Sequence, residues 1–483
     1  MEEGEFAGTI GRYYGESEAH WPPEPAPPAG APNVLIVVLD DVGYAQLGCF
    51  GSDIATPALD GLAARGLRYA NFHTTALCSP TRACVLTGRN HHACGMGRVI
   101  ELATGFPGYD ARIPRSCGLL PAMLTPHGYA AYAVGKWHLT PEDELVLGAR
   151  RDRWPLGRGF ERFYGFFGGE THQFVPALAH DNHVVEPPGT YEDGYHLTED
   201  LASRAIEYLE DLRHVDVDKP WLLYLAPGAC HSPHQAPAEW IDRYRGYFDG
   251  GWDRWREATL RRQVDGGLLP AHTRLSPRPD WVPAWDSLPA PARQVCARYM
   301  EAFAGFLSHA DAQIGRVTDW LERAGELDRT LVVVLSDNGA SSEGGLVGSL
   351  NDVRAWNVVP NTVEEAASRL DEIGGPRIHK NYPWGWTVAG NTPFRRWKRE
   401  THEGGVADPL IVCWPGGIPA RGEVRRQYVH ATDLVPTILD VIGIDPPARL
   451  GGVEQRPFDG ASFARSFADA HAPEHHATQY YEM

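Results

Sequence analysis

The sequence predicts an α/β fold: a large mixed, mostly parallel sheet sandwiched by helices, with a smaller carboxyl-terminal α+β subdomain. The first observation is that short, uniformly apolar runs recur along the chain, as in strands buried on both faces of a sheet. These runs are 34–39, 130–134, 221–225 and 331–335. The second observation is that amphipathic helical segments lie between the runs, an alternation that favours a layered sheet covered on both sides.

Three parts are expected within the 483 residues. Residues 1–32 form a proline-rich arm, in which 21–28 predicts an extended polyproline segment. Residues 33–400 contain all four apolar runs and form the large α/β domain. Residues 401–483 form the smaller subdomain.

Between the predicted strands, helical periodicity predicts helices over 198–213, capped by Thr198, and over 298–324. Residues 140–195 and 245–296 break this pattern and are predicted to be long surface insertions. Aromatic residues in the first insertion either wall an apolar substrate pocket or form a minor core, and the minor core is the more common arrangement. They are Phe160, Phe163, Tyr164, Phe166 and Phe167, with His172 nearby.

The carboxyl-terminal part begins with a predicted strand over 410–414 and a helix over 433–442, which Thr432 caps and Gly443 ends. The chain stops within 479–483, a run that resembles a strand. We expect either a truncated form or an incomplete subdomain. Unpaired, this strand would be an exposed edge.

Composition argues against several classes of partner. The net charge of −18 and the lack of a basic run disfavour nucleic acid. No stretch reaches the roughly 18 apolar residues of a membrane span. Residues 1–5 are acidic where a secretory signal would be basic, which predicts a cytoplasmic protein. The eight cysteines lack regular spacing and are expected to be buried thiols.

Polar residues follow each of the four predicted strands. In open α/β sheets, ligands bind beyond the carboxyl ends of the strands. We therefore expect these residues to face one crevice. They are Asp40 and Asp41 after the first run, Lys136 and His138 after the second, Cys230 and His231 after the third, and Asp337 and Asn338 after the fourth.

Two of these strand ends predict a metal site. A single pair of carboxylates at a strand end most often caps a turn. Asp40, Asp41, Asp337 and Asn338 together would form an anionic cage of oxygen ligands. Adjacent carboxylates are costly without a cation, and hard oxygen ligands favour calcium or magnesium over zinc.

Cys78 is predicted to begin a helix, because Pro80 suits a first helical turn. Three interpretations are open: a buried cysteine that packs the helix, a thiolate nucleophile, or a residue that is chemically modified. Arg82 lies one helical turn on and could hold a thiolate or an alkoxide.

Four further cationic or titratable residues have both a structural and a functional interpretation. Lys136 and His138 either bind an anion together or are a solvated lysine and a packed histidine. His231 has the same ambiguity, and His234 could take its role. Lys398 lies in a basic cluster, which is usually solvated surface. If Lys398 does face an anion, its replacement by Ala should lower turnover with little loss of stability.

The run Cys78-Ser79-Pro80-Thr81-Arg82, within 76–88, resembles the signature of the type I sulfatases, a family of the alkaline phosphatase superfamily. Residues 128–138 are similar to that family's second signature, with Ala131 where Ser or Thr is usual. The resemblance runs from Asn33 past Gly405.

The resemblance implies the sulfatase fold and an arylsulfatase-like hydrolysis of small sulfate monoesters. It also implies that a formylglycine-generating enzyme converts Cys78 to Cα-formylglycine. One calcium ion would be held by the oxygens of Asp40, Asp41, Asp337 and Asn338 and by an oxygen of the modified Cys78.

The resemblance also implies a role for each remaining site residue. Asp337 helps to deprotonate the attacking hydroxyl of the hydrated aldehyde, and Arg82 is the arginine of the signature. Lys136 and Lys398 bind the sulfate oxygens. The two histidines complete the set: His231 protonates the departing alcohol, and His138 assists the release of sulfate.

Two alternatives stay open. The same nucleophile serves phosphonate monoester and phosphodiester hydrolases, whose substrates are also tetrahedral monoanions. If Cys78 stays a thiol, the site could only bind sulfated ligands.

Overall fold

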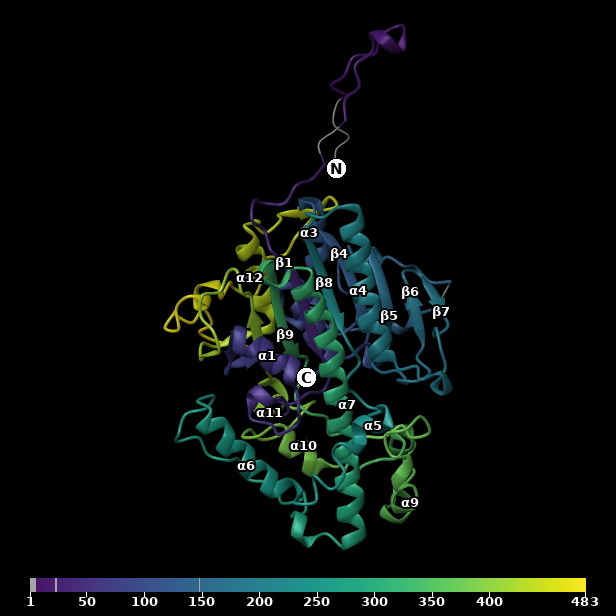
Figure 1. Cartoon of the computed structure of the whole chain (residues 1–483), viewed down its shortest axis with the longest axis vertical. Coiled ribbons are helices and arrows are strands. Elements are labelled where there is room, and N and C mark those ends of the chain that lie inside the picture. Colours follow the sequence, from purple (N-terminus) through teal and green to yellow (C-terminus); the bar gives the residue numbers. More distant parts are fainter. Residues whose placement is uncertain (1–5, 22–23, 147) are drawn as a thin grey trace.

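The computed structural model describes residues 6–21, 24–146 and 148–483. Its largest sheet has ten strands (Figure 1). They are β1 (Asn33–Leu39), β2 (Leu67–Tyr69), β4 (Ala130–Lys136), β5 (Arg162–Phe166), β6 (Leu178–His180), β7 (His183–Val185), β8 (Trp221–Ala226), β9 (Thr330–Ser336), β10 (Leu410–Cys413) and β11 (Glu423–Arg425). Two small sheets pair β3 (Phe72–His73) with β12 (Val429–His430) and β13 (Arg449–Leu450) with β14 (Val453–Glu454).

The sheet is mixed and mostly parallel, as the sequence predicts. Its strand order is β11-β2-β10-β9-β1-β8-β4-β5-β6-β7. The five strands from β9 to β5 run parallel, while β10 and β6 pair antiparallel with them on the two sides. All four predicted strands are present, as β1, β4, β8 and β9, and they are neighbours at the centre of the sheet.

Helices cover both faces of this sheet (Figure 1). The α-helices of the described residues are α1 (Pro57–Arg65), α2 (Cys78–Thr87), α3 (Leu120–Leu124), α4 (Leu197–Val215), α5 (Ala238–Asp242), α6 (Gly251–Asp265), α7 (Ala290–Arg323), α8 (Asp352–Trp356), α9 (Val363–Ser368), α10 (Trp384–Gly390), α11 (Glu403–Val406) and α12 (Leu434–Ile442). In Figure 1, α5, α6, α9 and α10 lie together below the sheet, around the lower half of α7.

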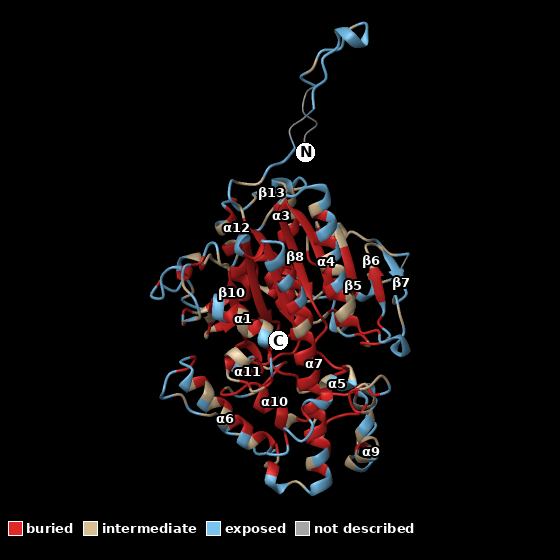
Figure 2. Ribbon diagram, in the orientation of Figure 1, coloured by how far each residue is buried: buried red, intermediate tan, exposed pale blue. Residues whose placement is uncertain are grey.

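Two hydrophobic layers result, one on each side of the sheet. In β1, Leu35 and Val37 belong to the layer under α1, α4 and α7, whereas Val34 and Ile36 belong to the layer under α2, α3 and α12. Figure 2 shows the central strands as buried along their whole length. The uniformly apolar composition of the predicted strands therefore reflects burial on two faces.

Both predicted helices are present, with different ends. The helix predicted over 198–213 is α4, but its cap is His196, whose ring Nδ1 accepts a hydrogen bond from the Thr198 backbone at 3.2 Å. The helix predicted over 298–324 is α7, which begins at Ala290. Residues 245–296 are thus not one irregular insertion, since they contain α6 and the start of α7.

The burial of α6 explains why the sequence did not predict it. Trp252 and Trp255 of this helix are buried, but so are Arg256 and Gln263. Because polar and apolar side chains share this buried face, apolar residues do not recur along α6 at the spacing that predicts an amphipathic helix.

The first predicted insertion, 140–195, also contributes to the main sheet. Phe163, Tyr164 and Phe166 lie in β5, and Phe160 and Phe167 flank it. Phe163 and Phe166 extend into opposite hydrophobic layers. These side chains are therefore part of the main core, and they form neither a substrate pocket nor a minor core. The tertiary pairing of β5 with β4 places them there.

The carboxyl-terminal part differs from the prediction in three elements. The predicted strand 410–414 is β10, which pairs with β9 and β2 inside the main sheet. Thr432 lies in a short 3-10 turn before α12 and does not cap it, whereas Gly443 ends α12 in a left-handed conformation as predicted. Residues 479–483 are not a strand. The Tyr481 hydroxyl instead contacts the Tyr428 hydroxyl at 2.5 Å.

The described part of the arm leads away from the body of the protein at the top of Figure 1. It contains a 3-10 turn at Tyr14–Glu16 and a bridge between Thr9 and Glu18. Pro22 and Pro23 of the predicted polyproline segment lie outside the described residues.

Candidate active site

The carboxyl ends of the central strands meet at one site. Asp40 and Asp41 follow β1, and Asp337 and Asn338 follow β9. The register of these two strands places Leu39 opposite Ser336, so the four polar side chains start from the same level. Lys136 ends β4 on the other side of β8. The structure thus brings together residues that the sequence places about 300 positions apart.

Cys78 is the first residue of α2 and faces this site. Its side chain is buried, and its Sγ lies 3.3 Å from Nδ1 of His138. Burial alone would raise the pKa of the thiol, but the charges of Lys136 and His138 lower it below its ordinary value. These charges therefore favour the thiolate form of an unmodified Cys78.

Arg82 binds Asp337 from within the site. Its Nε and Nη2 donate to Oδ2 of Asp337 at 3.0 Å and 2.6 Å, and Nη2 lies 3.6 Å from Oδ2 of Asp40. Arg82 and both carboxylates are fully buried. The guanidinium thus compensates two carboxylates that burial would otherwise penalise.

The pKa values of Asp40 and Asp337 are shifted in opposite directions. Burial would raise the pKa of Asp40, but the positive charges of Lys136, His231 and Arg82 lower it. Lys136 Nζ donates to Oδ2 of Asp40 at 2.7 Å. The pKa of Asp337 is raised, first by burial and then by the charge of Asp40. Two adjacent buried carboxylates interact unfavourably unless a further cation is present.

Lys398 is buried and belongs to the site. Its Nζ donates to Oδ2 of Asp41 at 3.0 Å and lies 3.1 Å from Nε2 of His231 and 3.4 Å from Oε2 of Glu343. The interpretation of Lys398 as solvated surface is therefore wrong. Within the same basic cluster, Arg395 and Arg399 are exposed.

The structure also distinguishes His231 from His234. His231 Nδ1 donates to the carbonyl of Ser232 at 2.7 Å, which leaves Nε2 facing Lys398 and Asp41. The pKa of His231 is raised to about 9: burial and Lys398 lower it, but Asp41 and Asp40 outweigh them. His234 packs against Phe303 and accepts a hydrogen bond from Lys380 at 3.2 Å, away from the site.

The donor set fits a hard cation. Oδ1 of Asp40 and Oδ1 of Asn338 are buried oxygens without a hydrogen-bond partner. Asn338 Nδ2 donates to Oδ1 of Asp41 at 2.7 Å, which turns its free oxygen away from that bond. Ligand atoms of Asp40, Asp41 and His231 lie within 4.8 Å of one another. Unpaired buried oxygens are costly, and a hard cation that prefers oxygen ligands would satisfy them.

Comparison with known proteins decides the family. A sequence model of the sulfatase family matches residues 32–444. The chain belongs to the sulfatase family. Hydrolysis of sulfate esters is the chemistry that this membership supports, and the mixed sheet is that of the alkaline phosphatase superfamily.

Two curated relatives match most of this sulfatase. It is 31% identical over 434 residues to an uncharacterized sulfatase of Schizosaccharomyces pombe, covering 86% of this chain and 76% of the relative. It is 27% identical over 446 residues to the arylsulfatase of Klebsiella aerogenes, covering 90% and 91%. The crystal structure of the PsFucS1 sulfatase from Pseudoalteromonas sp. is similar in fold, with a TM-score of 0.57, 20% identity and coverage of 91% and 72%.

Three glutamates of this sulfatase were not predicted from the sequence. Glu101 contacts His138, Glu343 contacts Lys398, and Glu170 lies 3.7 Å from Nδ1 of His231. Each follows no predicted strand and lies in irregular backbone or a short 3-10 turn. No local sequence pattern marks such residues, because only tertiary packing brings them to the site.

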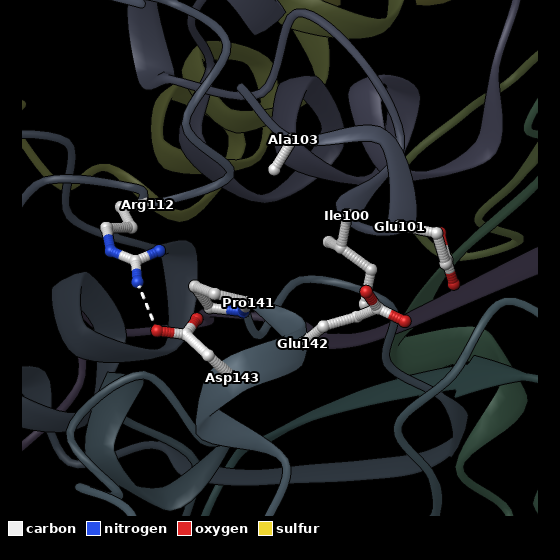
Figure 3. A pocket seen from close by; sticks show the side chains of 7 residues that line it. All are labelled: Ile100, Glu101, Ala103, Arg112, Pro141, Glu142 and Asp143. Carbon is white, nitrogen blue, oxygen red and sulfur yellow. Dashed lines mark hydrogen bonds and ion pairs between the residues drawn. The ribbon is translucent and has the colours of Figure 1, made fainter. Parts of the chain in front are cut away.

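Glu101 also lines a surface pocket, shown in Figure 3 with Ile100, Ala103, Arg112, Pro141, Glu142 and Asp143. Arg112 donates to Asp143 on one side of this pocket at 2.6 Å.

Among the described residues, no helix is both long enough and apolar enough to span a membrane.

Proposed function

We propose that this sulfatase hydrolyses small sulfate monoesters at Cys78 after its conversion to Cα-formylglycine, with one calcium ion bound by Asp40, Asp41, Asp337 and Asn338. The observation that carries the proposal is the position of Cys78. It begins α2 at the site where Lys136, His138 and the aspartates converge. A hydrated formylglycine supplies two hydroxyl groups, one to attack sulfur and one whose deprotonation releases sulfate.

The lysines suit the binding of a sulfate group. Each of the cations Lys136 and Lys398 binds one carboxylate of the paired aspartates, Lys136 that of Asp40 and Lys398 that of Asp41. With calcium bound to these carboxylates, the lysines would be free to stabilise charge on the sulfate oxygens. Such preorganised charges are the largest catalytic contribution in many enzymes.

The two histidines are placed for two different proton transfers, His138 at position 78 and His231 at the departing alcohol. His138 Nδ1 faces position 78 and can accept a proton from a hydroxyl group there. His231 Nε2 faces the space beside Lys398, where it can protonate a departing alcohol. Its Nδ1 donates to the carbonyl of Ser232, so Nε2 is the atom from which a protonated imidazole would give a proton to the alcohol.

Burial of Cys78 supports modification before folding. Cys78 is only 2% exposed. A formylglycine-generating enzyme could therefore reach it only in an unfolded or nascent chain.

The aromatic residues around Phe163 do not support an aryl group on the substrate, because their side chains lie in the core.

Two measurements test the proposal. Mass spectrometry of the Cys78 peptide should find the aldehyde or its hydrate, and only thiol at that position would contradict the covalent reaction. Turnover of an aryl sulfate should exceed turnover of an aryl phosphonate monoester. Faster phosphonate turnover would favour the phosphonate hydrolase instead, while binding of sulfate esters without turnover would favour a sulfated-ligand binder.

A further inference from the structure

Glu101 and Cys78 lie on opposite sides of the His138 ring. Both carboxylate oxygens of Glu101 lie 3.0 Å from Nε2 of His138. On the other side of the ring, Nδ1 lies 3.3 Å from Sγ of Cys78. The imidazole of His138 therefore contacts the carboxylate of Glu101 through one nitrogen and the side chain of Cys78 through the other.

This arrangement determines which nitrogen of His138 exchanges protons. An ionised carboxylate can only accept hydrogen bonds, so Nε2 must carry a proton whether the imidazole is neutral or charged. Glu101 is ionised at neutral pH: burial would raise its pKa, but the charge of His138 and its hydrogen bond lower the pKa to about 2. The remaining exchangeable position is Nδ1, which faces residue 78.

The surroundings hold the ring in this orientation. His138 has a positive φ of 55°, and its backbone N–H donates to the carbonyl of Phe167 at 3.1 Å. A Cβ atom at Gly169 would lie only 2.9 Å from Cε1 of His138 and 3.2 Å from Oε1 of Glu101. The backbone at Gly169 thus packs closely against the contact between the two side chains.

We propose that Glu101 is a positioning residue for the reaction at Cys78: it keeps the proton on Nε2 of His138, so that Nδ1 takes protons from the group at position 78. This inference rests on the proposed hydrolysis of sulfate esters. Glu101 acts only through His138 and need not touch the sulfate group. A carboxylate that orients an imidazole in this way commonly sets the tautomer that general-base catalysis requires.

The pocket in Figure 3 supplies a matched control. Glu142 is an exposed carboxylate that lines the same pocket as Glu101. Replacing Glu142 by Gln removes the same charge from the same pocket. A general effect of negative charge on substrate binding would appear in both Glu101→Gln and Glu142→Gln, whereas positioning of His138 would appear in the first alone.

The decisive measurement is a double-mutant cycle on kcat with the formylglycine-containing enzyme. We expect Glu101→Ala to lower kcat by about 100-fold with a change in KM below about 3-fold. In a His138→Ala background the same substitution should change kcat by less than about 3-fold, because its route of action is already lost. Glu101→Gln should fall between wild type and Glu101→Ala, and Glu142→Gln should stay within about 2-fold of wild type.

Three outcomes would overturn the inference. They are an unchanged kcat in Glu101→Ala, equal losses in the two backgrounds, and an equal loss in Glu142→Gln. If Glu101→Ala does not fold, Glu101→Gln carries the same cycle.

A readout without substrate separates this inference from the proposed function. In ¹⁵N spectra of histidine-labelled protein, the His138 signals are assigned by their absence from His138→Asn. Wild type should show a protonated Nε2, and Glu101→Ala should lose that preference. An unprotonated Nε2 in wild type would overturn the inference even if sulfate esters are hydrolysed. A wild type that hydrolyses no ester would contradict the proposed function while leaving this test intact.

Discussion

The Nζ of Lys398 lies 3.0 Å from Oδ2 of Asp41, although 357 residues separate the two along the chain. Lys398 is 2% exposed, and its neighbours His231 and Glu343 are also largely buried. This contact joins the loop before α11 to the end of β1. It also changes what removal of the lysine should do.

Replacement of Lys398 by Ala should lower both turnover and stability. Loss of one partner from a buried ion pair costs about 3–5 kcal/mol, so the free energy of unfolding should fall by that order in EDTA. Turnover should fall by about 100-fold or more, because the variant lacks the cation that we propose binds the sulfate. The sequence alone predicted little loss of stability for Lys398→Ala, whereas the buried ion pair predicts a large one.

Urea unfolding and steady-state kinetics measure both effects. The exposed Arg395→Ala should change neither, and a stable Lys398→Ala would contradict the pairing.

Calcium should stabilise the folded protein through Asn338. The free Oδ1 atoms of Asp40 and Asn338 predict a cation that binds only the folded state. At 100 times its Kd, such an ion adds about 2.7 kcal/mol to the free energy of unfolding. Thermal unfolding with calcium and with EDTA should show this difference in wild type and a much smaller one in Asn338→Ala.

Asp311→Asn is the matched control for the calcium prediction. Asp311 is a buried carboxylate that accepts backbone hydrogen bonds from Ala58 and Leu59 of α1. It should keep the full response to calcium. Equal responses in wild type and Asn338→Ala would place the cation elsewhere.

Gly169→Ala should reduce turnover by displacing His138. The added methyl group would lie 2.9 Å from Cε1 of His138, closer than side chains normally approach. We expect kcat to fall by about 10-fold and the free energy of unfolding by about 1–3 kcal/mol. Gly168→Ala is the control, because its nearest neighbour would be a carbonyl oxygen at 3.6 Å. Equal kinetics of the two variants would refute the predicted displacement.

Glu326 should stabilise the protein in a pH-dependent way, far from the active site. It is 3% exposed and accepts hydrogen bonds from Arg213, Trp221 and Asn33. Burial raises the pKa of Glu326, but the hydrogen bond and charge of Arg213 lower it below its ordinary 4.5. The unfolded state then binds more protons, so the stabilisation is present above pH 4.5 and is lost as the pH falls below it.

Glu326→Gln should therefore cost about 1–3 kcal/mol at neutral pH. The difference from wild type should shrink as the pH falls below the ordinary value. Urea unfolding between neutral and acidic pH measures it. Glu322→Gln is the control, since the side chain of Glu322 forms an exposed ion pair with Arg65. A difference between wild type and Glu326→Gln that stays constant with pH would argue against the linkage.

Much of the fold could be predicted because its central strands are buried on both faces. β1, β4, β8 and β9 consist of apolar residues alone or nearly so, and each is followed by polar residues. Elements whose burial depends on distant partners were missed. α6 has a mixed buried face, and β5 needs β4 beside it. β10 was predicted as a strand, but its place in the main sheet between β9 and β2 was not.

The site divides in the same way. Asp40, Asp41, Asp337 and Asn338 could be grouped from the sequence, because parallel strands end at one edge of a sheet. Cys78 and Arg82 could be paired, because they lie one helical turn apart in α2. Glu101, Glu170 and Glu343 could not be found, since no strand end or helical spacing connects them to the residues they contact.

The sequence by itself determined the class of fold, the sulfatase signature at Cys78 and the polar residues at the strand ends. These depend on hydrophobic periodicity and local motifs, which act over a few residues. Only the tertiary structure decided that His231 and not His234 faces the site, that Lys398 is buried beside Asp41, and that Glu101 holds His138. The physical reason is that burial, ion pairing and tautomer depend on contacts between segments that lie 37 to 357 residues apart, which no local pattern encodes.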